Sequence, residues 1–175
     1  QPRLLPWQTT ADNIALGLRA QGMARSAARE RAHAMGAVLG LDAEALAAYP
    51  HQLSGGMQSR AALARALVLE PDLLLMDEPF AALDIGLKAQ LHRLLLRHQA
   101  GKGTAVLMIT HDLMEAVRLA DTVLVMAAGP GRIVHMHAPQ APALARDDAT
   151  VYHDTAGLLR VPAVRAAFGL DVLQD

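Results

Sequence analysis

Leu73-Leu74-Leu75-Met76-Asp77-Glu78-Pro79 is an unbroken apolar run that ends in two acids and a proline. A run of this kind is typical of a parallel strand that is covered on both faces. Asp77 and Glu78 then lie at the carboxyl end of the strand, where the ligand sites of open α/β sheets are found. The stretch therefore predicts an α/β fold with a candidate site at that end of the sheet. The simpler alternative is a pair of strand-end acids that cap the next segment.

A second strand with a polar end is predicted further along the chain. Two glycines break the helix that precedes it, and an apolar run over residues 105–109 follows. Thr110-His111-Asp112 comes at the carboxyl end of this run, as Glu78 does at the end of the first run. We therefore expect His111 and the acid pair to lie at the same edge of the sheet. The other histidines are interpreted as ordinary core or surface residues.

A helix with an unusual start is predicted before the first strand. The segment Leu53-Ser54-Gly55-Gly56-Met57-Gln58 opens it. Ser54 is a good N-cap, the two glycines allow close approach to the backbone, and residues 57–69 are rich in Ala and Leu. A helix N-terminus with free amides and no bulky side chains suits an anion. The alternative is a glycine-softened helix start without a ligand.

These segments, in this order and with Ala82-Leu83-Asp84 between the last two, resemble the second half of an ATP-binding-cassette (ABC) ATPase. The resemblance implies an α/β fold, namely a fragment of the P-loop NTPase architecture with a parallel-sheet core plus a helical subdomain. It also implies ATP and Mg²⁺ as cofactors. Asp77 matches the aspartate that holds Mg²⁺, usually through water. Glu78 matches the general base that polarises the attacking water, and His111 the switch histidine at the γ-phosphate.

The resemblance also assigns residues that contact ATP held by a second subunit. In this family the signature motif meets the γ-phosphate of ATP bound to the opposite subunit. The matching residues are Ser54, Gly55, Gly56 and Gln58. Asp84 matches the D-loop. We expect Asp84 to cap a helix that runs to about Gln99 and also to reach the partner's site in a head-to-tail homodimer.

The N-terminal stretch indicates a branch of the family and an incomplete chain. Leu4-Leu5-Pro6-Trp7, followed by residues 12–18, resembles the importer branch associated with nitrate, sulfonate and taurine. The two prolines of this stretch predict an ordered extended loop, pinned by Trp7. The glycine-rich lysine loop with which P-loop proteins grip phosphate has no match in the sequence. We therefore expect an N-terminally truncated chain, in which Gln1 or the residue before it is the metal-sensing glutamine.

The chain is divided into three segments by its motifs. Residues 1–70 hold the remainder of the loop that begins at the metal-sensing glutamine, the helical subdomain and the signature helix. Residues 71–137 hold the C-terminal part of the ATPase core, and residues 138–175 form the tail.

Hydrophobic periodicity predicts three helices before the signature helix and a hairpin after the second strand. The helices cover residues 10–18 with Thr10 as N-cap, 26–39 and 42–48. The hairpin pairs residues 122–126 with 133–136, and its His135 and His137 are too few for a metal site. In the tail we expect a helix broken at Pro162, and no function is evident there.

Composition limits the classes of function. The chain of 175 residues is 53% hydrophobic, which is enough for a real core. A net charge of -1 and 3% aromatic residues argue against a nucleic-acid partner. The chain has no cysteine, which excludes disulfides and thiolate metal sites. No apolar run approaches the roughly 20 residues that span a bilayer, so we expect any membrane role to go through a partner.

The resemblance therefore predicts the ATP-hydrolysing subunit of an importer. MgATP hydrolysis in a homodimer would be coupled to uptake of a small anion such as nitrate, sulfonate or taurine. The expected partners are a second ATPase subunit, membrane permease subunits and, indirectly, a solute-binding protein. The expected location is peripheral, at the cytoplasmic face of the inner membrane. The alternative is a non-catalytic ABC-type module that only supplies its signature motif to a partner's ATP.

Overall fold

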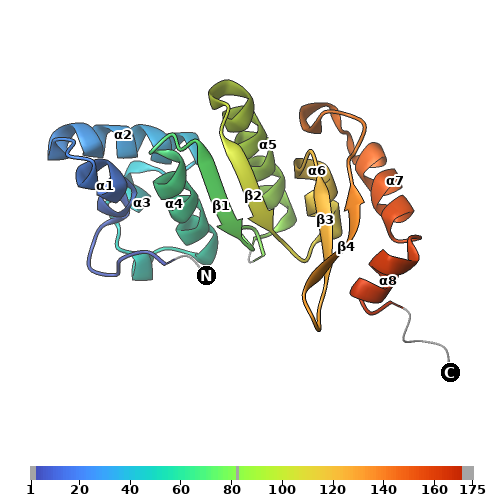
Figure 1. Cartoon of the computed structure of the whole chain (residues 1–175). Helices are drawn as coiled ribbons and strands as arrows, with labels where there is room; N and C mark the ends of the chain where they lie inside the picture. Colours follow the sequence, from blue (N-terminus) through green and yellow to red (C-terminus); the bar gives the residue numbers. More distant parts are fainter. Residues whose placement is uncertain (1–2, 82, 171–175) are drawn as a thin grey trace. The chain divides into compact units, whose positions relative to one another are not determined.

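The computed structural model describes residues 3–81 and 83–170 (Figure 1). Gln1, expected near the metal-sensing position, lies outside these residues. The chain divides into two compact units, Gln1–Ile109 and Thr110–Asp175. Within the described ranges, no helix is long and apolar enough to cross a membrane. The three segments drawn from the motifs, with boundaries at residues 70 and 137, stay a prediction.

The described part of the first unit contains helices at the positions predicted before the first strand and between the two strands. Its helices are α1 (Thr10–Ala20), α2 (Arg25–Val38), α3 (Ala43–Ala47), the 3₁₀ helix η1 (Pro50–Gln52), α4 (Gly55–Leu67) and α5 (Ile85–Lys102). The predicted caps Ser54 and Asp84 are confirmed, since each side chain accepts a hydrogen bond from the backbone N–H of the third residue of its helix. The prediction for α1 was wrong by one residue. Thr9 is the N-cap, and the buried Thr10 donates its hydroxyl to the Ala48 carbonyl at 2.9 Å.

The loop before α1 is ordered, but Trp7 does not pin it. The Trp7 side chain is 71% exposed, so the expected anchor is wrong. The fully buried Asn13 of α1 holds the loop instead. Its Oδ1 accepts the Leu5 N–H at 2.7 Å, and its Nδ2 donates to the Leu5 and Gln8 carbonyls, both at 3.1 Å. A buried amide can accept a hydrogen bond from a backbone N–H and donate to backbone carbonyls at the same time, whereas an indole ring can only donate.

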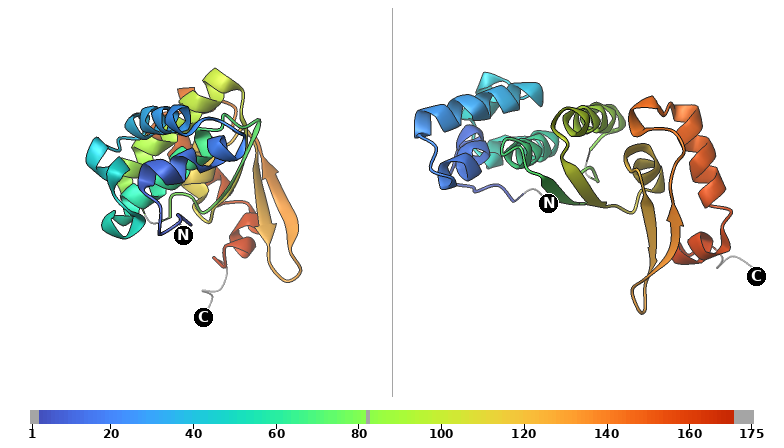
Figure 2. Two further views of the ribbon diagram at one scale, coloured as in Figure 1. Left: turned by 90° about the vertical axis from the view of Figure 1, so that its left-hand side faces the viewer. Right: turned by 45° about the horizontal axis from the view of Figure 1, so that its top comes forward.

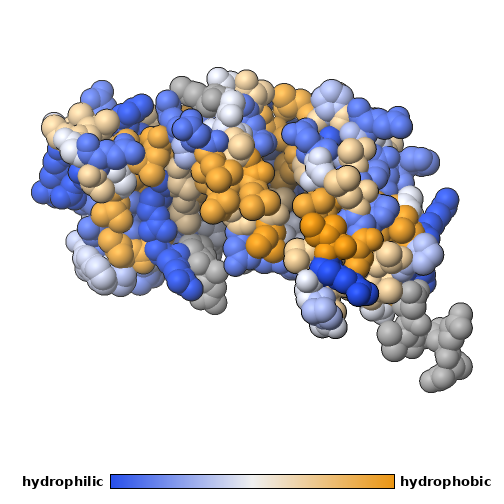
Figure 3. All heavy atoms as spheres, viewed as in Figure 1, coloured by the Kyte–Doolittle hydropathy of each residue, from blue (hydrophilic) through white to orange (hydrophobic). Residues whose placement is uncertain are grey.

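Strands β1 (Leu73–Asp77) and β2 (Ala105–Ile109) pair in parallel, with Leu73 opposite Ala105 and Asp77 opposite Ile109. Alternate residues of β1 are buried, and Leu75 on the other face is 66% exposed. The expected cover on both faces is therefore absent among the described residues. Figure 3 shows the apolar surface over these two strands. The exposed apolar side chains of the pair are Leu73, Leu75, Leu107 and Ile109.

The second unit is built on the predicted hairpin. Its described elements are α6 (Leu113–Leu119), β3 (Val123–Ala127), β4 (Arg132–His137), the 3₁₀ helix η2 (Ala143–Ala145), α7 (Asp148–Leu158) and α8 (Pro162–Ala167). β3 and β4 are antiparallel, with an irregularity between Val125 and Met126. Figure 2 shows α7 and α8 packed along the hairpin. The tail therefore has a structural role, because Val151, Leu158 and Val164 share one core with Val117 and Val125.

Arg146 connects the tail to α6. Its side chain is buried, and its Nη1 donates to the carbonyls of Val117 at 2.7 Å and Ala120 at 2.8 Å. Its Nε donates to the Ala141 carbonyl at 2.7 Å. The bonds to Val117 and Ala120 satisfy carbonyls at the C-terminal end of α6, where the helix offers no further N–H partner. Burial lowers the pKa of the Arg146 guanidinium, while Asp121 and Asp154 raise it, and the group stays cationic at ordinary pH.

We predict that Arg146→Met lowers the stability of the second unit by about 2–4 kcal/mol, because one buried and several partly buried carbonyls lose their donor. Native-state hydrogen exchange of the α6 and α7 amides measures this. The exposed Arg160 provides the matched control, since Arg160→Met removes the same charge from the same unit. Equal protection in the two variants would show that Arg146 is not the link between tail and helix.

Candidate functional site

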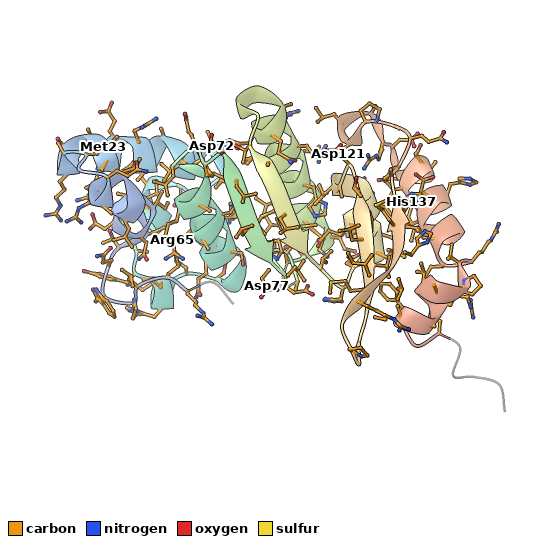
Figure 4. The ribbon with its side chains drawn as sticks, viewed as in Figure 1. Met23, Arg65, Asp72, Asp77, Asp121 and His137 are labelled. Atoms are coloured by element: carbon orange, nitrogen blue, oxygen red, sulfur yellow. The ribbon has the colours of Figure 1, made fainter. Side chains whose placement is uncertain are left out.

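The acid pair lies at the carboxyl end of β1, beside the end of β2. In Figure 4, Asp77 is at one tip of β1 and Asp72 is near the other. The β1–β2 ladder continues one residue beyond β1, because the Glu78 N–H donates to the Ile109 carbonyl at 2.9 Å. Asp77 is exposed and Glu78 is half-buried. The carboxylates are thus accessible to a ligand while their backbone is held by the sheet.

Glu78 has a backbone conformation that L-residues rarely adopt. Its φ is +47°, in the left-handed region. This conformation costs an ordinary residue about 1–2 kcal/mol. Packing just beyond it holds the corner, because the Phe80 side chain is 1% exposed and meets the His92 ring of α5 edge-on, with 4.8 Å between ring centroids. A strained residue kept in place by its surroundings is characteristic of functional sites.

A groove of about 450 Å³ runs from this corner along α4. Its lining includes both acids and three polar residues that the sequence analysis did not single out, namely Arg3, Ser59 and Arg65. Arg65 Nη1 donates to the Arg3 carbonyl at 2.8 Å, and burial lowers the pKa of the Arg65 guanidinium. The groove therefore combines carboxylates with guanidinium groups. The available signal for this groove in the sequence was a face of α4 with small residues beside Arg65, namely Ser59, Ala62 and Ala66.

At the start of α4, nothing packs against Gly55, whereas α5 packs against Gly56. The Ser54 hydroxyl accepts the Met57 N–H at 3.2 Å. A side chain at Gly55 would meet nothing within 4 Å, whereas one at Gly56 would lie 3.0 Å from Leu87 Cδ2 of α5. Gly55 therefore leaves the helix N-terminus open to a ligand, and Gly56 is small because α5 packs there.

Two further predicted residues have local structural partners. Gln58 Nε2 donates to the carbonyls of Pro50 at 3.0 Å and Leu53 at 3.3 Å, so this amide holds the turn that leads into α4. Asp84 Oδ1 accepts the Leu87 N–H at 2.9 Å and starts α5. Since Leu87 also faces Gly56, the first unit brings the starts of α4 and α5 together. Ala82 of the predicted D-loop lies outside the described residues.

His111 belongs to the second unit, where it is exposed and comes just before Asp112, the N-cap of α6. Its placement next to Glu78 stays a prediction. Among the residues that the structure describes, no group of three or more acids or histidines could hold a metal. Mg²⁺ is commonly bound by one or two carboxylates, with water and substrate phosphates as its other ligands. The exposed Asp77 fits that mode of binding.

The family described as "ABC transporter" matches residues 1–81. The chain is 49% identical to the taurine import ATP-binding protein TauB of Chromobacterium violaceum over 134 residues, which are 77% of this chain and 51% of that protein. It is 52% identical to the aliphatic sulfonates import ATP-binding protein SsuB 1 of Pseudomonas fluorescens over 129 residues, 74% of this chain and 48% of that protein. The chain therefore resembles the ATP-binding subunits of ABC transporters. It spans about half the length of these curated relatives.

The fold of the ABC ATPase cassettes is confirmed by solved structures. The dimeric structure of the ATP-binding cassette MJ0796 in a post-hydrolysis state, bound to ADP and Pi, superposes with a TM-score of 0.73 at 29% identity. The superposition covers 81% of this chain and 61% of that chain. A second dimeric structure of MJ0796, described as a bacterial ABC transporter cassette, gives a TM-score of 0.72. The expected α/β P-loop NTPase fold is therefore present in this chain.

We predict that Glu78→Gly raises the stability of the native protein by about 0.5–1 kcal/mol, because glycine adopts a positive φ without strain. Equilibrium urea unfolding measures the change. Glu70 is a matched control outside the acid pair, since it has the same φ of +47°. If Glu70→Gly stabilises the protein but Glu78→Gly destabilises it, the prediction is wrong, and the Glu78 carboxylate itself stabilises the fold.

Proposed function

We propose that the native protein is the ATP-hydrolysing subunit of an ABC importer. The observation that carries the proposal is the acid pair at the carboxyl end of β1, with Glu78 tied to β2 through the Ile109 carbonyl. Support also comes from the relatives, whose names describe ATP-binding proteins for taurine and aliphatic sulfonate import. Taurine or an aliphatic sulfonate is therefore the proposed cargo class, and nitrate is a further anion of the same branch.

In this proposal Asp77 would hold Mg²⁺, which would neutralise the charge of the β- and γ-phosphates. Glu78 accepts a hydrogen bond from the attacking water and takes its proton as general base. The half-buried setting and fixed backbone of Glu78 limit the directions from which water reaches its carboxylate. His111 donates to the γ-phosphate and helps to hold the water.

The start of α4 and Asp84 serve the second subunit in this proposal. At the open N-terminus of α4, backbone N–H groups and the Ser54 hydroxyl donate hydrogen bonds to the γ-phosphate bound by the partner copy, and Gly55 leaves room for that phosphate. Gln58 keeps the turn before α4 in shape, and Gly56 lets α5 pack close enough for Asp84 to face the same nucleotide. The partners are then a second copy of the subunit, membrane permease subunits and, indirectly, a solute-binding protein. The site of action is peripheral, at the cytoplasmic face of the inner membrane.

We predict that Glu78→Gln retains ATP binding and ATP-dependent dimerisation but lowers the turnover number by a factor on the order of 10²–10⁴, because an amide cannot accept the proton. Turnover of the native protein is measured by phosphate release, and dimerisation by light scattering. Glu70→Gln is the matched control, with the same substitution at the same φ of +47°.

The outcomes separate the two candidate functions. Turnover within a few fold of wild type in Glu78→Gln would mean that Glu78 is not the base. A native protein that forms ATP-dependent dimers with a partner ATPase, yet hydrolyses no ATP at its own acid pair, would instead be the non-catalytic module.

A further inference from the structure

A second cleft in the first unit lies away from the acid pair, between the C-terminal half of α2 and the exposed face of α5. Its volume is about 600 Å³, within the usual range of small-molecule sites. One part of its wall is apolar and is formed by Met35, Val38 and Leu94. The polar part includes Gln90, Arg93 and Arg97 of α5. No residue of the acid pair, of the start of α4 or of Asp84 lines this cleft.

The charged residues of α5 are all basic. No acidic residue occurs between Asp84 and Asp112, although the whole chain has a net charge of -1. Arg93 and Arg97 are four residues apart, so their side chains leave the same face of the helix, and both are exposed. Arg93 Nε donates to the Ala89 carbonyl at 3.3 Å, which fixes one edge of its guanidinium. Within the described ranges, neither arginine forms an ion pair with a carboxylate.

The chemistry of the wall specifies a class of ligand. Two guanidinium groups on one helix face suit an oxyanion, which accepts several charge-assisted hydrogen bonds from them. Val38 is 63% exposed at the same cleft, and the half-buried Met35 can adapt to ligands of different shape. An apolar wall beside a pair of cations suits a molecule with an anionic head and an aliphatic body.

We propose that this α2–α5 cleft binds a small amphipathic organic anion, such as an alkanesulfonate or an alkanoate, at a site separate from the nucleotide site. The cleft is concave and of molecular size, which favours a free small molecule over a lipid surface. Binding there does not depend on the proposed ATPase function, because none of the residues assigned to ATP hydrolysis lines it.

The test uses hexanesulfonate and isothermal titration calorimetry on the whole native protein in the presence of saturating ADP, so that the nucleotide site is blocked. We expect saturable binding with a dissociation constant in the millimolar range or below. Sulfate and hexanol serve as partial ligands. Each is expected to bind at least about tenfold more weakly, since sulfate lacks the aliphatic body and hexanol lacks the charge.

Variants distinguish the cleft from general charge attraction. Arg93→Gln and Arg97→Gln should each weaken hexanesulfonate binding about tenfold. Val38→Ser should weaken hexanesulfonate but leave ethanesulfonate unchanged. Arg19→Gln, at an exposed arginine of α1 outside the cleft, should have no effect.

Three results would overturn the proposal. Hexanesulfonate that binds no better than sulfate would remove the role of the apolar wall. An effect of Arg19→Gln as large as that of Arg97→Gln would mean that the protein attracts anions without a site. Arg97-dependent binding to phosphatidylglycerol vesicles, without binding of hexanesulfonate, would identify a membrane-surface contact instead.

Discussion

The hydrogen bond from the Glu78 N–H to the Ile109 carbonyl is the contact on which the proposed site depends. It extends the β1–β2 ladder by one residue beyond the point where β1 ends. The backbone must turn at Glu78 into a left-handed conformation, so the chain leaves the sheet at a fixed angle. Asp77 and Glu78 are therefore adjacent in sequence but differ in surroundings, one exposed and the other half-buried. Two carboxylates with different surroundings can take different roles.

Within each of the two units, polar side chains hold loops and helix ends in place. Asn13 fixes the N-terminal loop, Gln58 the turn before α4, and Arg146 the end of α6. Each satisfies backbone groups that would otherwise lose hydrogen bonds on burial. This explains how a chain with 3% aromatic residues keeps ordered loops. The proposed nucleotide contacts at Ser54 and Asp84 use the same residues that cap helices, so one side chain serves both the fold and the site.

The sequence predicted the features that depend on local chemistry. Caps such as Ser54 and Asp84, and the strands on either side of α5, follow from short-range hydrogen bonding and from runs of apolar residues. Features that depend on long-range packing were not foreseen. Trp7 looked like an anchor because of its size, yet the smaller Asn13 holds the loop because only an amide matches the backbone groups there. Arg65 lines the acid groove from α4, and the small residues beside it on that helix are a weak signal, because they do not show which strand the helix face meets.

The most direct test of the central claim is where the metal of the nucleotide binds. Mn²⁺ can replace Mg²⁺ because both prefer oxygen ligands, and it broadens the NMR signals of nearby nuclei. The two ends of β1 are roughly 13 Å apart, since a strand rises about 3.3 Å per residue. With MnATP bound to the native protein, we predict strong broadening of the amides of Asp77 and Glu78 and little at Asp72. Broadening at Asp72 equal to or greater than that at Asp77 would contradict the account.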